Sequence, residues 1–314
     1  MKKKTCVIVG GAGFIGSAIA RELSKQGAFI KIVDDLSSGD MKKIPEGVAF
    51  YKLDISLPQA VTALEAIFTG ADYVFHLAAK LSVPESIQDP VLYHKTNIDG
   101  MQNVVEAAKA AGVHKVIFSS SSAVYGDIEK SPTTEADKVQ PKSPYALHKA
   151  YGEQLLKLYS ELYNLKSVSL RYFNVYGPGH RDKGAYAPVV ALFVKQFYDN
   201  VPLTVCGDGK QTRDFIHIHD VVRANIAAAM ADTDGAEVFN IGSGQDTSVL
   251  RLAEMFGAEV THVEARLEPK FSKADITKAA ELLNWSPTIS IEEGVGDFLR
   301  YPKLRFDIDT KLYV

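Results

Sequence analysis

The sequence predicts an α/β fold in which a doubly wound parallel sheet is covered by helices on both faces. Two observations predict it: short β-branched runs alternate with runs of helical period, and glycines separate the first strand from the first helix. A chain of 314 residues suffices for about two domains, and no linker-like or repeated stretch divides it. We therefore expect a second, smaller α/β domain that is interleaved with the first.

The first part of the chain supplies most of the expected sheet. The expected strands are 5–9, 29–33, 48–53, 71–77 and 115–118, and the helical runs between them lie near 14–23, 57–68 and 90–111. A late strand near 237–241 is expected to return to this sheet. Residues 1–174 then form one domain together with that strand, and residues 175–314 mainly form the other. Ligands of such sheets bind at the carboxyl ends of the strands, so residues that follow strands are the first candidates.

A glycine-rich turn follows the first expected strand, with the sequence Gly10-Gly11-Ala12-Gly13-Phe14-Ile15-Gly16. Glycines let the backbone come close to a pyrophosphate, and the N-terminus of the next helix offers N–H groups and a positive dipole end. The alternative is a tight turn that binds nothing. The strand before the turn and the helix after it favour a dinucleotide site. Its expected residues are Gly10, Gly13, Phe14, Ile15 and Gly16.

Acidic residues stand at the end of the second expected strand. The carboxylates of Asp34 and Asp35 are placed to accept hydrogen bonds from the hydroxyls of an adenosine ribose. They would also repel a 2′-phosphate. This pattern favours NAD over NADP as the cofactor.

The next two strands also end in candidate cofactor residues. Asp54 and Ile55 follow the third strand and are placed to meet the adenine. Ala78 and Ala79 follow the fourth strand, and their small side chains would let a cofactor lie against the backbone.

Tyr145 and Lys149 open a helical run and share one face of it, because residues four apart on a helix are neighbours. An ammonium beside a phenol favours the phenolate, and a nicotinamide cation would favour it further. The result is a tyrosine able to exchange protons near neutral pH, as hydroxyl oxidation by NAD requires. The alternative is an ordinary Tyr and Lys on a surface helix.

Four serines, 119–122, end the fifth expected strand shortly before that helix. Because strand side chains alternate in direction, Ser119 and Ser121 are expected to face one way and Ser120 and Ser122 the other. One hydroxyl is placed to reach a substrate oxygen. A solvated loop is the alternative.

Together these motifs resemble the extended short-chain dehydrogenase/reductases, and more narrowly the UDP-glucose 4-epimerase-like enzymes of nucleotide sugars. The resemblance also rests on residues 119–126, on Arg171-Tyr172-Phe173-Asn174 and on the segment 211–217, and it covers nearly the whole chain. One departure is Val9, where the family usually has a threonine before the glycines. The resemblance implies a Rossmann-type NAD domain and a nucleotide-sugar domain.

The resemblance implies roles for individual residues. Ser121, counted back from Tyr125-Gly126, would hydrogen-bond the sugar C4 oxygen, and Tyr145 would be the base and acid. Lys149 would lower the pKa of the tyrosine and hold the nicotinamide ribose. Further implied cofactor residues are Ser38, Leu77, Asn97 and Phe173, and the implied substrate residues are Asn174, Arg213, Arg266 and Ser272.

The implied activity is NAD-dependent 4-epimerisation of UDP-hexoses, UDP-glucose and UDP-galactose, through a transient 4-keto sugar. Relatives that dehydrate or decarboxylate carry an acidic residue just after the catalytic Ser/Thr, whereas Ser121 is followed by Ser122-Ala123-Val124. A dehydratase, decarboxylase or reductase of the same family remains an alternative, as does a catalytically silent NAD-sensing protein.

One position bears on the choice of sugar. Ser272 stands where strict UDP-glucose/galactose epimerases carry tyrosine, so UDP-N-acetylglucosamine and UDP-N-acetylgalactosamine are expected substrates as well. The spacing from Arg266 is one residue shorter than usual. Phe271 is therefore the alternative occupant of this position.

Composition and charge limit the partners. A net charge of −3 gives no reason to expect nucleic acid, and no apolar run is long enough to span a bilayer. Cys6 and Cys206 form no paired metal spacing, and two histidines on one strand, His217 and His219, are more often structural than ligands. We therefore expect no metal.

The remaining expectations concern location and assembly. The N-terminus shows no signal-peptide pattern, and the two cysteines suit a reducing compartment, so a cytoplasmic protein is expected. In the family, helices matching 90–111 and 143–163 pair with their copies. Apolar residues on more than one side of these helices fit a homodimer, and packing within the subunit is the alternative.

Overall fold

The computed structural model describes residues 1–127, 130–180, 188–265 and 270–305. The chain divides into two compact units. The first comprises Met1–Gly126, Lys138–Arg171 and Val222–Phe239, and the second comprises Asp127–Asp137, Tyr172–Val221 and the residues from Asn240 onward. The two units are therefore interleaved along the chain, with one border after Arg171 instead of after residue 174.

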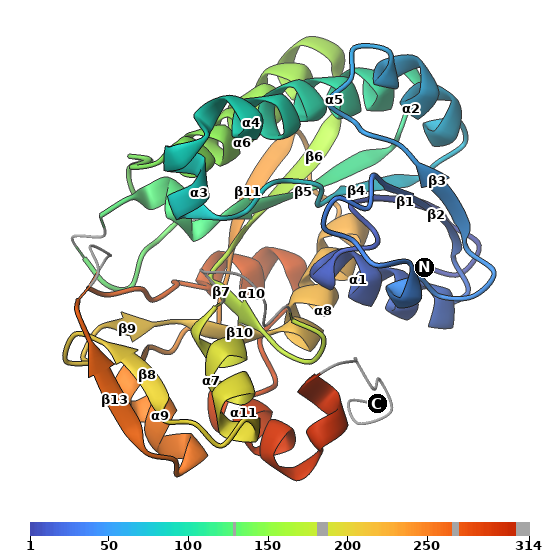
Figure 1. Ribbon diagram of the computed structural model, residues 1–314. Helices are drawn as coiled ribbons and strands as arrows, with labels where there is room; N and C mark the ends of the chain where they lie inside the picture. Colours follow the sequence, from blue (N-terminus) through green and yellow to red (C-terminus); the bar gives the residue numbers. More distant parts are fainter. Residues whose placement is uncertain (128–129, 181–187, 266–269, 306–314) are drawn as a thin grey trace. The chain divides into compact units, whose positions relative to one another are not determined.

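A seven-stranded sheet forms the centre of the first unit within the described residues (Figure 1). The strand order is β11-β6-β5-β4-β1-β2-β3, and β1 to β5 pair in parallel, as the sequence predicts. The late strand β11 does return to this sheet. The strands are β1 (Thr5–Val9), β2 (Phe29–Asp34), β3 (Ala49–Lys52), β4 (Tyr73–His76), β5 (Lys115–Ser121), β6 (Lys166–Tyr172) and β11 (Ala236–Ile241).

Helices cover both faces of this sheet. Figure 1 shows α2, α5 and α6 on one face and α1 and α8 on the other. Their apolar sides form the core, and Leu64, Val104 and Leu156 within it are fully buried. The helices are α1 (Phe14–Lys25), α2 (Ala60–Phe68), α3 (Val83–Gln88), α4 (Pro90–His94), α5 (Gly100–Ala110), α6 (Pro144–Tyr163) and α8 (Ile218–Met230), with short 3-10 turns η1 (Met41–Lys43) and η3 (Ser122–Tyr125).

The long helix expected near 90–111 is interrupted. A π-helical turn, η2 (Lys95–Asp99), separates α4 from α5. Single π turns inside helices are frequently found at functional sites. This one carries Asn97, a predicted cofactor residue.

The second unit is built from small sheets and helices around its own core. Strand β10 pairs in parallel with β7, β13 pairs in parallel with β8, and β12 pairs antiparallel with β9. Phe193, Val205 and Leu252 are fully buried there. The elements are β7 (Asn174–Tyr176), α7 (Val189–Tyr198), β8 (Leu203–Cys206), β9 (Thr212–Arg213), β10 (Phe215–His217), β12 (Thr247–Ser248), α9 (Val249–Phe256), β13 (Val260–Val263), α10 (Thr277–Leu283), α11 (Ile291–Arg300) and η4 (Pro302–Arg305).

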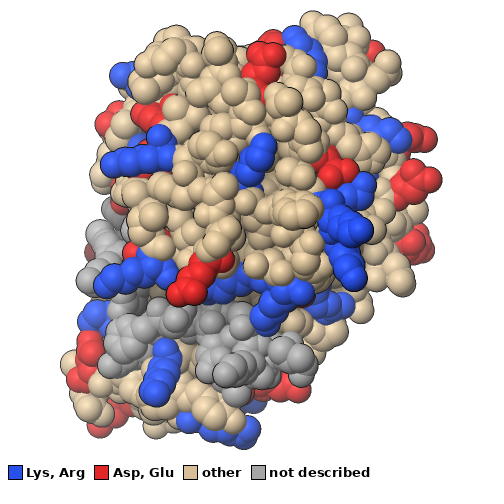
Figure 2. Space-filling model, turned by 90° about the vertical axis from the view of Figure 1, so that its right-hand side faces the viewer, with Lys and Arg blue, Asp and Glu red and all other residues tan. Residues whose placement is uncertain are grey.

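The surface agrees with the near-neutral composition. Figure 2 shows one face of the molecule, on which basic and acidic side chains are interspersed among uncharged ones. In the described part of the chain, every helix is too short or too polar to cross a membrane.

Candidate active site

The glycine turn after β1 is packed too closely for side chains. Gly10 has a φ of +86°, and a Cβ there would lie 2.6 Å from the backbone nitrogen of Ala78. A Cβ on Gly16 would lie 2.2 Å from the carbonyl oxygen of Gly10. Ala78 follows β4, and β1 lies between β4 and β2. The strand order reverses at this place, where ligands of open α/β sheets bind.

The N-terminus of α1 adjoins this turn. Gly13 is the N-cap, no side chain caps the helix, and the first turn contains no acidic residue. The first N–H groups of a helix have no acceptor within the helix, and the dipole there favours an anion. The turn and the helix end therefore fit the pyrophosphate of NAD, with Phe14 and Ile15 in the first turn.

Asp34, at the end of β2, fixes the loop beside the glycine turn. Its carboxylate accepts hydrogen bonds from the backbone N–H groups of Ala12 and Leu36, both at 2.9 Å. Burial raises the pKa of this carboxyl, although the two hydrogen bonds lower it. A carboxylate has about four acceptor positions, so each oxygen retains one for a ribose hydroxyl. Asp35 is exposed and accepts from the backbone and hydroxyl of Ser37.

The other predicted adenosine residues lie on nearby loops of the same unit. Ser38 is exposed. The carboxylate of Asp54 accepts from the backbone N–H of Ser56 at 2.9 Å. Ile55 is buried against Gly100, where a Cβ would lie 2.9 Å from the isoleucine side chain.

Asn97 holds the segment that continues from β4 through Leu77, Ala78 and Ala79. Its Oδ1 accepts from the backbone N–H of Lys80 at 2.8 Å, and its Nδ2 donates to the Lys80 carbonyl oxygen at 3.0 Å. The π turn thus fixes the backbone at the carboxyl end of β4. Contact of these residues with NAD remains a prediction.

The structure brings Ser121, Tyr145 and Lys149 together within the first unit. Ser121 ends β5, and the other two residues lie in the first turns of α6, which Ser143 caps by accepting from the backbone N–H of Ala146. Tyr145 shares a side-chain hydrogen bond with Ser121. The ammonium of Lys149 donates to the Ser119 carbonyl oxygen at 2.7 Å and lies 5.8 Å from the centroid of the Tyr145 ring.

In the chain without a cofactor, the pKa values of Tyr145 and Lys149 differ from those expected from the sequence. Burial raises the pKa of Tyr145 to about 12, and the hydrogen bond with Ser121 only partly opposes this rise. Burial also lowers the pKa of Lys149 to about 7, against the opposite effect of the nearby Glu153 carboxylate. The expected lowering of the tyrosine pKa by the lysine is not found in the chain alone, where burial has the largest effect on the pKa of both side chains.

A buried ion pair lies one helical turn beyond Lys149. Both carboxylate oxygens of Glu153 accept from Arg171, from Nη2 at 2.7 Å and from Nε at 2.9 Å. Ser120 donates to the same carboxylate at 2.5 Å, and Arg171 donates to the Tyr125 hydroxyl at 2.8 Å.

Three residues of α6 thus bind three successive serines at the end of β5. Lys149 binds the backbone of Ser119, Glu153 binds the side chain of Ser120, and Tyr145 binds the side chain of Ser121. Sequence reasoning missed Glu153, although its place four residues after Lys149 puts it on the same helix face.

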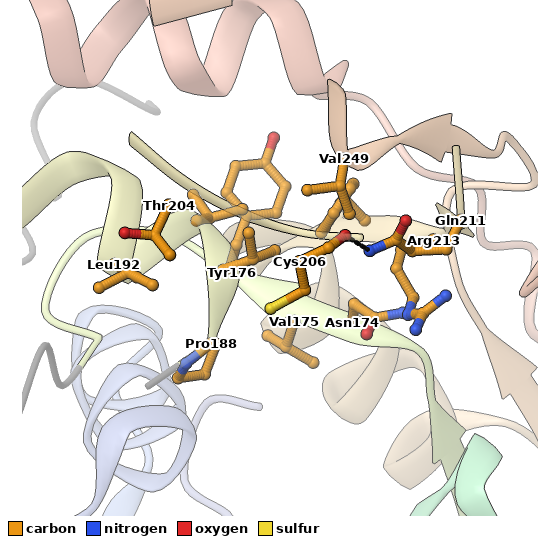
Figure 3. Close-up of a pocket in the computed structure, with 13 residues that line it drawn as sticks. Asn174, Val175, Tyr176, Pro188, Leu192, Thr204, Cys206, Gln211, Arg213 and Val249 are labelled. Carbon is orange, nitrogen blue, oxygen red and sulfur yellow. Dashed lines mark hydrogen bonds between the residues drawn. The ribbon is translucent and has the colours of Figure 1, made fainter. Parts of the chain in front are cut away.

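A pocket of about 240 Å³ lies in the second unit (Figure 3). It brings together two of the predicted substrate residues, Asn174 from β7 and Arg213 from β9. Most of the wall is apolar, and Arg213 supplies its cationic side chain. The lining residues are Asn174, Val175, Tyr176, Pro188, Val189, Val190, Leu192, Thr204, Cys206, Gln211, Arg213, Phe215 and Val249.

Sequence reasoning missed the contribution of β8 to this pocket. Thr204 and Cys206 are half-buried and line it, whereas Leu203 and Val205 are buried in the core. The side chain of Gln211 donates to the Cys206 carbonyl oxygen at 3.1 Å and closes one side. Apolar Leu203 and Val205 alternate with Thr204 and Cys206, and this alternation is the sequence pattern that could have predicted which residues of β8 face the pocket.

The other predicted substrate residues are placed differently. Arg266 lies outside the described residues. Ser272 is buried, whereas Phe271 is 52% exposed, so the serine is the inward-facing residue of the two. Phe173 is buried, and its N–H donates to the carbonyl oxygen of Ile241.

The histidine pair on β10 and the start of α8 lies in a packed environment. His217 is fully buried, with its ring 5.2 Å from that of Tyr176 in an edge-to-face contact. Over residues 1–127, 130–180, 188–265 and 270–305, no group of three or more His, Cys, Asp or Glu side chains is arranged to hold a metal ion.

A seven-stranded Rossmann-type sheet, a glycine turn at its switch point and a Ser–Tyr–Lys group define a nucleotide-dependent enzyme of the short-chain dehydrogenase/reductase type. Residues 6–242 match the model of the NAD dependent epimerase/dehydratase family. The chain belongs to this family.

Individual relatives cover nearly the whole chain. A UDP-glucose 4-epimerase from Thermotoga maritima, solved with UDP-glucose, is 37% identical with a TM-score of 0.90, covering 95% of this chain and 98% of its own. A UDP-N-acetylglucosamine 4-epimerase from Methanobrevibacter ruminantium, solved with UDP-N-acetylmuramic acid, is 36% identical with a TM-score of 0.89, covering 96% and 99%. A UDP-N-acetyl-alpha-D-glucosaminuronate decarboxylase from Bacillus cytotoxicus is 34% identical, covering 95% and 98%.

Proposed function

We propose that this protein is an NAD-dependent 4-epimerase that interconverts UDP-hexoses through a transient 4-keto sugar. The observation that carries the proposal is the Ser121–Tyr145–Lys149 group at the carboxyl end of β5, with no carboxylate in the turn that follows. That turn, η3, is Ser122-Ala123-Val124-Tyr125. Elimination or decarboxylation in relatives uses an acid just after the catalytic Ser/Thr, so this turn favours epimerisation.

The protein's own residues handle the proton. Tyr145 takes the proton of the sugar C4 hydroxyl and later returns it to the C4 oxygen. Ser121 already shares a hydrogen bond with Tyr145 and holds that oxygen. NAD, when bound, would supply the acceptor for the C4 hydride and the donor for its return to the opposite face of the sugar. Proton and hydride are both returned, so substrate and product have the same composition.

The pKa values of Tyr145 and Lys149 imply that the base must be activated before it can act. With a pKa of about 12 for Tyr145 in the chain alone, the phenolate is scarce at neutral pH. Lys149, with a pKa of about 7, gains its ammonium form readily as the pH falls. We infer that the positive charge of the nicotinamide ring is needed to lower the pKa of Tyr145 into the working range. Cofactor binding and activation of the base are then coupled.

The pocket of the second unit suits the nucleotide diphosphate. Arg213 offers a planar guanidinium, which fits phosphate oxygens by two parallel hydrogen bonds, and Asn174 offers an amide beside it. The apolar wall formed by Val175 and Leu192 suits a flat base. Arg266 is proposed as a second phosphate ligand.

The acceptance of N-acetylated sugars is proposed from Ser272. A buried serine leaves space that a phenol ring would fill, and an acetamido group at C2 needs such space. Relatives of both kinds, acting on UDP-glucose and on UDP-N-acetylglucosamine, match this chain with nearly equal identity. UDP-N-acetylglucosamine and UDP-N-acetylgalactosamine are therefore proposed substrates beside UDP-glucose and UDP-galactose.

The experiment is turnover by the purified protein without added NAD. The four UDP-sugars are incubated separately, and the products are identified by proton NMR. We expect each sugar to reach a mixture with its C4 epimer. Accumulation of a 4-keto-6-deoxy sugar or of a pentose would replace the proposal by a dehydratase or a decarboxylase, and no conversion of any sugar would favour a silent NAD-binding protein.

A homodimer is proposed from the helices α4 and α6. Val91 and Leu158 are 67% and 47% exposed, and Leu92, Leu147 and Leu162 are exposed as well. Of the other apolar residues on the helices expected at 90–111 and 143–163, Val104, Val105, Leu155 and Tyr159 are buried within the subunit, and Tyr151 is half-buried. The exposed set is therefore the one available to a second copy.

Light scattering at micromolar concentration tests the dimer. Leu158→Glu is expected to give a monomer, because it would place charges in an apolar contact. Leu282→Glu, on the exposed side of α10, is the control and should leave the mass unchanged. A monomeric parent protein would contradict the proposal.

We also propose a cytoplasmic location, which the two free cysteines support.

A further inference from the structure

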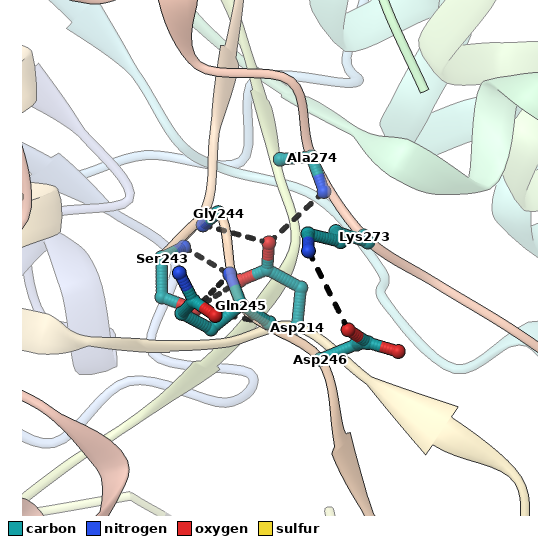
Figure 4. Close-up of polar contacts among 7 residues, drawn as sticks. All are labelled: Asp214, Ser243, Gly244, Gln245, Asp246, Lys273 and Ala274. Atoms are coloured by element: carbon teal, nitrogen blue, oxygen red, sulfur yellow. Dashed lines mark hydrogen bonds and ion pairs between the residues drawn. The ribbon is translucent and has the colours of Figure 1, made fainter. Parts of the chain in front are cut away.

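Asp214 is a fully buried carboxylate between β9 and β10 that the proposed chemistry does not use. It follows Arg213 directly, and its side chain lies among the backbone N–H groups of Ser243, Gly244 and Ala274 (Figure 4). A buried carboxylate without ligand contact is costly unless its oxygens are hydrogen-bonded. Its partners therefore indicate what it does.

The carboxylate joins two other segments of the second unit. Its Oδ1 accepts from the backbone N–H of Ser243 at 2.5 Å and from the Ser243 hydroxyl at 2.8 Å. Its Oδ2 accepts from the backbone N–H groups of Gly244 and Ala274, both at 3.0 Å. One side chain thus ties the turn after β11 to the segment that follows residue 270.

The backbone of Asp214 reaches a third segment. Its carbonyl oxygen accepts from the backbone N–H of Asn174 at 2.9 Å and from the Asn174 side-chain amide at 3.3 Å. Asn174 and Arg213 both line the pocket of the second unit. The predicted sugar residue Ser272 lies two positions before Ala274.

The packing around the carboxylate leaves little freedom. A Cβ on Gly242 would lie 2.7 Å from Asp214 Oδ2 and 2.6 Å from the Ala274 Cβ. On its other side, the segment of Ala274 is bound to Thr133, whose N–H donates to Lys273 and whose carbonyl accepts from Asp275, both at 2.8 Å. The ion pair of Lys273 with Asp246, 3.7 Å apart, lies on the partly exposed edge and adds little.

We propose that Asp214 is the positioning residue of the nucleotide-sugar pocket, fixing Asn174, Arg213 and the Ser272–Ala274 segment in one arrangement. It touches neither substrate nor cofactor and acts through these neighbours. The inference rests on the proposed function, because the pocket is taken to bind UDP-sugars. Four hydrogen bonds to a charged acceptor are stronger than bonds to a neutral one, so the arrangement depends on the carboxylate.

Asp214→Asn is the informative variant. The amide has nearly the same size, but its NH₂ group cannot accept from the N–H groups that face it. The Ser243 hydroxyl can turn to become an acceptor, whereas at least one backbone N–H is left facing an N–H. The turn after β11 and the segment of Ala274 then lose part of their attachment to Asp214 without the creation of a cavity, whereas the backbone contact of Asp214 with Asn174 stays.

The matched control is Asp220→Asn. Asp220 is also fully buried in the second unit, and its carboxylate accepts from the Thr288 N–H, the Thr288 hydroxyl and the Ile289 N–H at 2.7–3.0 Å. Neither Thr288 nor Ile289 lines the pocket. This variant therefore imposes a comparable loss of hydrogen bonds away from the predicted substrate residues.

The test measures UDP binding by titration calorimetry on the NAD-loaded proteins, together with melting temperature, NAD content and steady-state kinetics. For Asp214→Asn we expect the Kd for UDP and the KM for the UDP-sugar to rise roughly tenfold or more. The kcat should fall less than kcat/KM, and the NAD content should stay unchanged. Asp220→Asn should keep its Kd within about threefold at a similar loss of melting temperature.

The outcomes separate the possibilities. If both variants lose UDP affinity in proportion to their loss of melting temperature, Asp214 is merely structural and the inference is overturned. An Asp214→Asn protein that binds UDP like the parent overturns it as well. If that variant does not fold, Ser243→Ala decides, since it removes one hydrogen bond to the carboxylate together with the contacts of the hydroxyl with Gln245: a roughly threefold weaker Kd supports the inference, and an unchanged Kd rejects it. A parent protein that binds no UDP refutes the proposed function, and the inference with it.

Discussion

Glu153→Gln tests whether the buried ion pair of α6 supports both the fold and the catalytic group. The side chains of Glu153 and Arg171 are 3% and 5% exposed, and two hydrogen bonds join them. Removing one partner of a buried pair costs about 3–5 kcal/mol, because the other charge stays buried without compensation. Against a total stability of about 5–15 kcal/mol, this is a large fraction.

The substitution should also act on Lys149. The carboxylate of Glu153 raises the pKa of Lys149, which is about 7 in the parent. Without that carboxylate, the pKa of Lys149 should be lower still. At pH 7.5 fewer molecules then carry the ammonium, and kcat should fall in excess of any loss of folded protein. Lowering the pH toward 6 should raise kcat by a larger factor in the variant than in the parent, in which a larger share of Lys149 already carries the ammonium at pH 7.5.

Urea unfolding at constant NAD and the pH dependence of kcat are the measurements. Glu153→Gln/Arg171→Met, which removes both charges, should recover most of the lost stability. Asp234→Asn is the control in the same unit: Asp234 is 94% exposed and pairs with Lys166 at the start of the strand that carries Arg171. It should cost less than about 1 kcal/mol. A loss below about 1 kcal/mol for Glu153→Gln, or an unshifted pH profile, would refute the reasoning.

Four further outcomes are expected. Tyr145→Phe should lower kcat roughly 100- to 10,000-fold with a native circular dichroism spectrum, and activity within threefold of the parent would assign the proton transfer to another group. Burial lowers the pKa of Lys149 from 10.5 to about 7, so the unfolded state binds more protons between these values and stability should rise with pH, by up to about 1.4 kcal/mol per unit from pH 7 to 9. Comparing urea unfolding of Lys149→Met with the parent checks this, since the variant should lack the rise. Because Asp34 would oppose a 2′-phosphate, the nucleotide released on denaturation should be NAD; mainly NADP would contradict the assignment. Ser272→Tyr should lower kcat/KM for N-acetylated UDP-sugars selectively, and an equal fall for plain and acetylated sugars would remove Ser272 from the sugar pocket.

The parts of the fold that depend on local patterns could be predicted from the sequence. The β-branched run of β1 and the helical period of α1 appear where they were expected, because neighbouring residues dictate both. Strand β6 was missed. Ser167, Ser169 and Arg171 alternate with its apolar residues, so it looks half-exposed, yet every residue after Lys166 is buried. Arg171 can be buried only because Glu153, on another element, neutralises it.

The same distinction applies to the candidate site. The Tyr145–Lys149 pair could be predicted because four-residue spacing on a helix is local. The contacts of Glu153 and of Asp214 could not, since their partners lie far away in the sequence and only the fold brings them together. The pKa of Tyr145 also escaped prediction, because its burial follows from packing and not from the neighbouring lysine.

The central claim is that hydride leaves the sugar at C4 and returns within the same active site. The most direct measurement follows UDP-galactose carrying deuterium at C4 in ordinary water, with no NAD added. We expect UDP-glucose that retains the deuterium at C4, because proton transfer at Tyr145 involves only oxygen. Replacement of that deuterium by solvent hydrogen, or a requirement for added NAD in stoichiometric amounts, would contradict it.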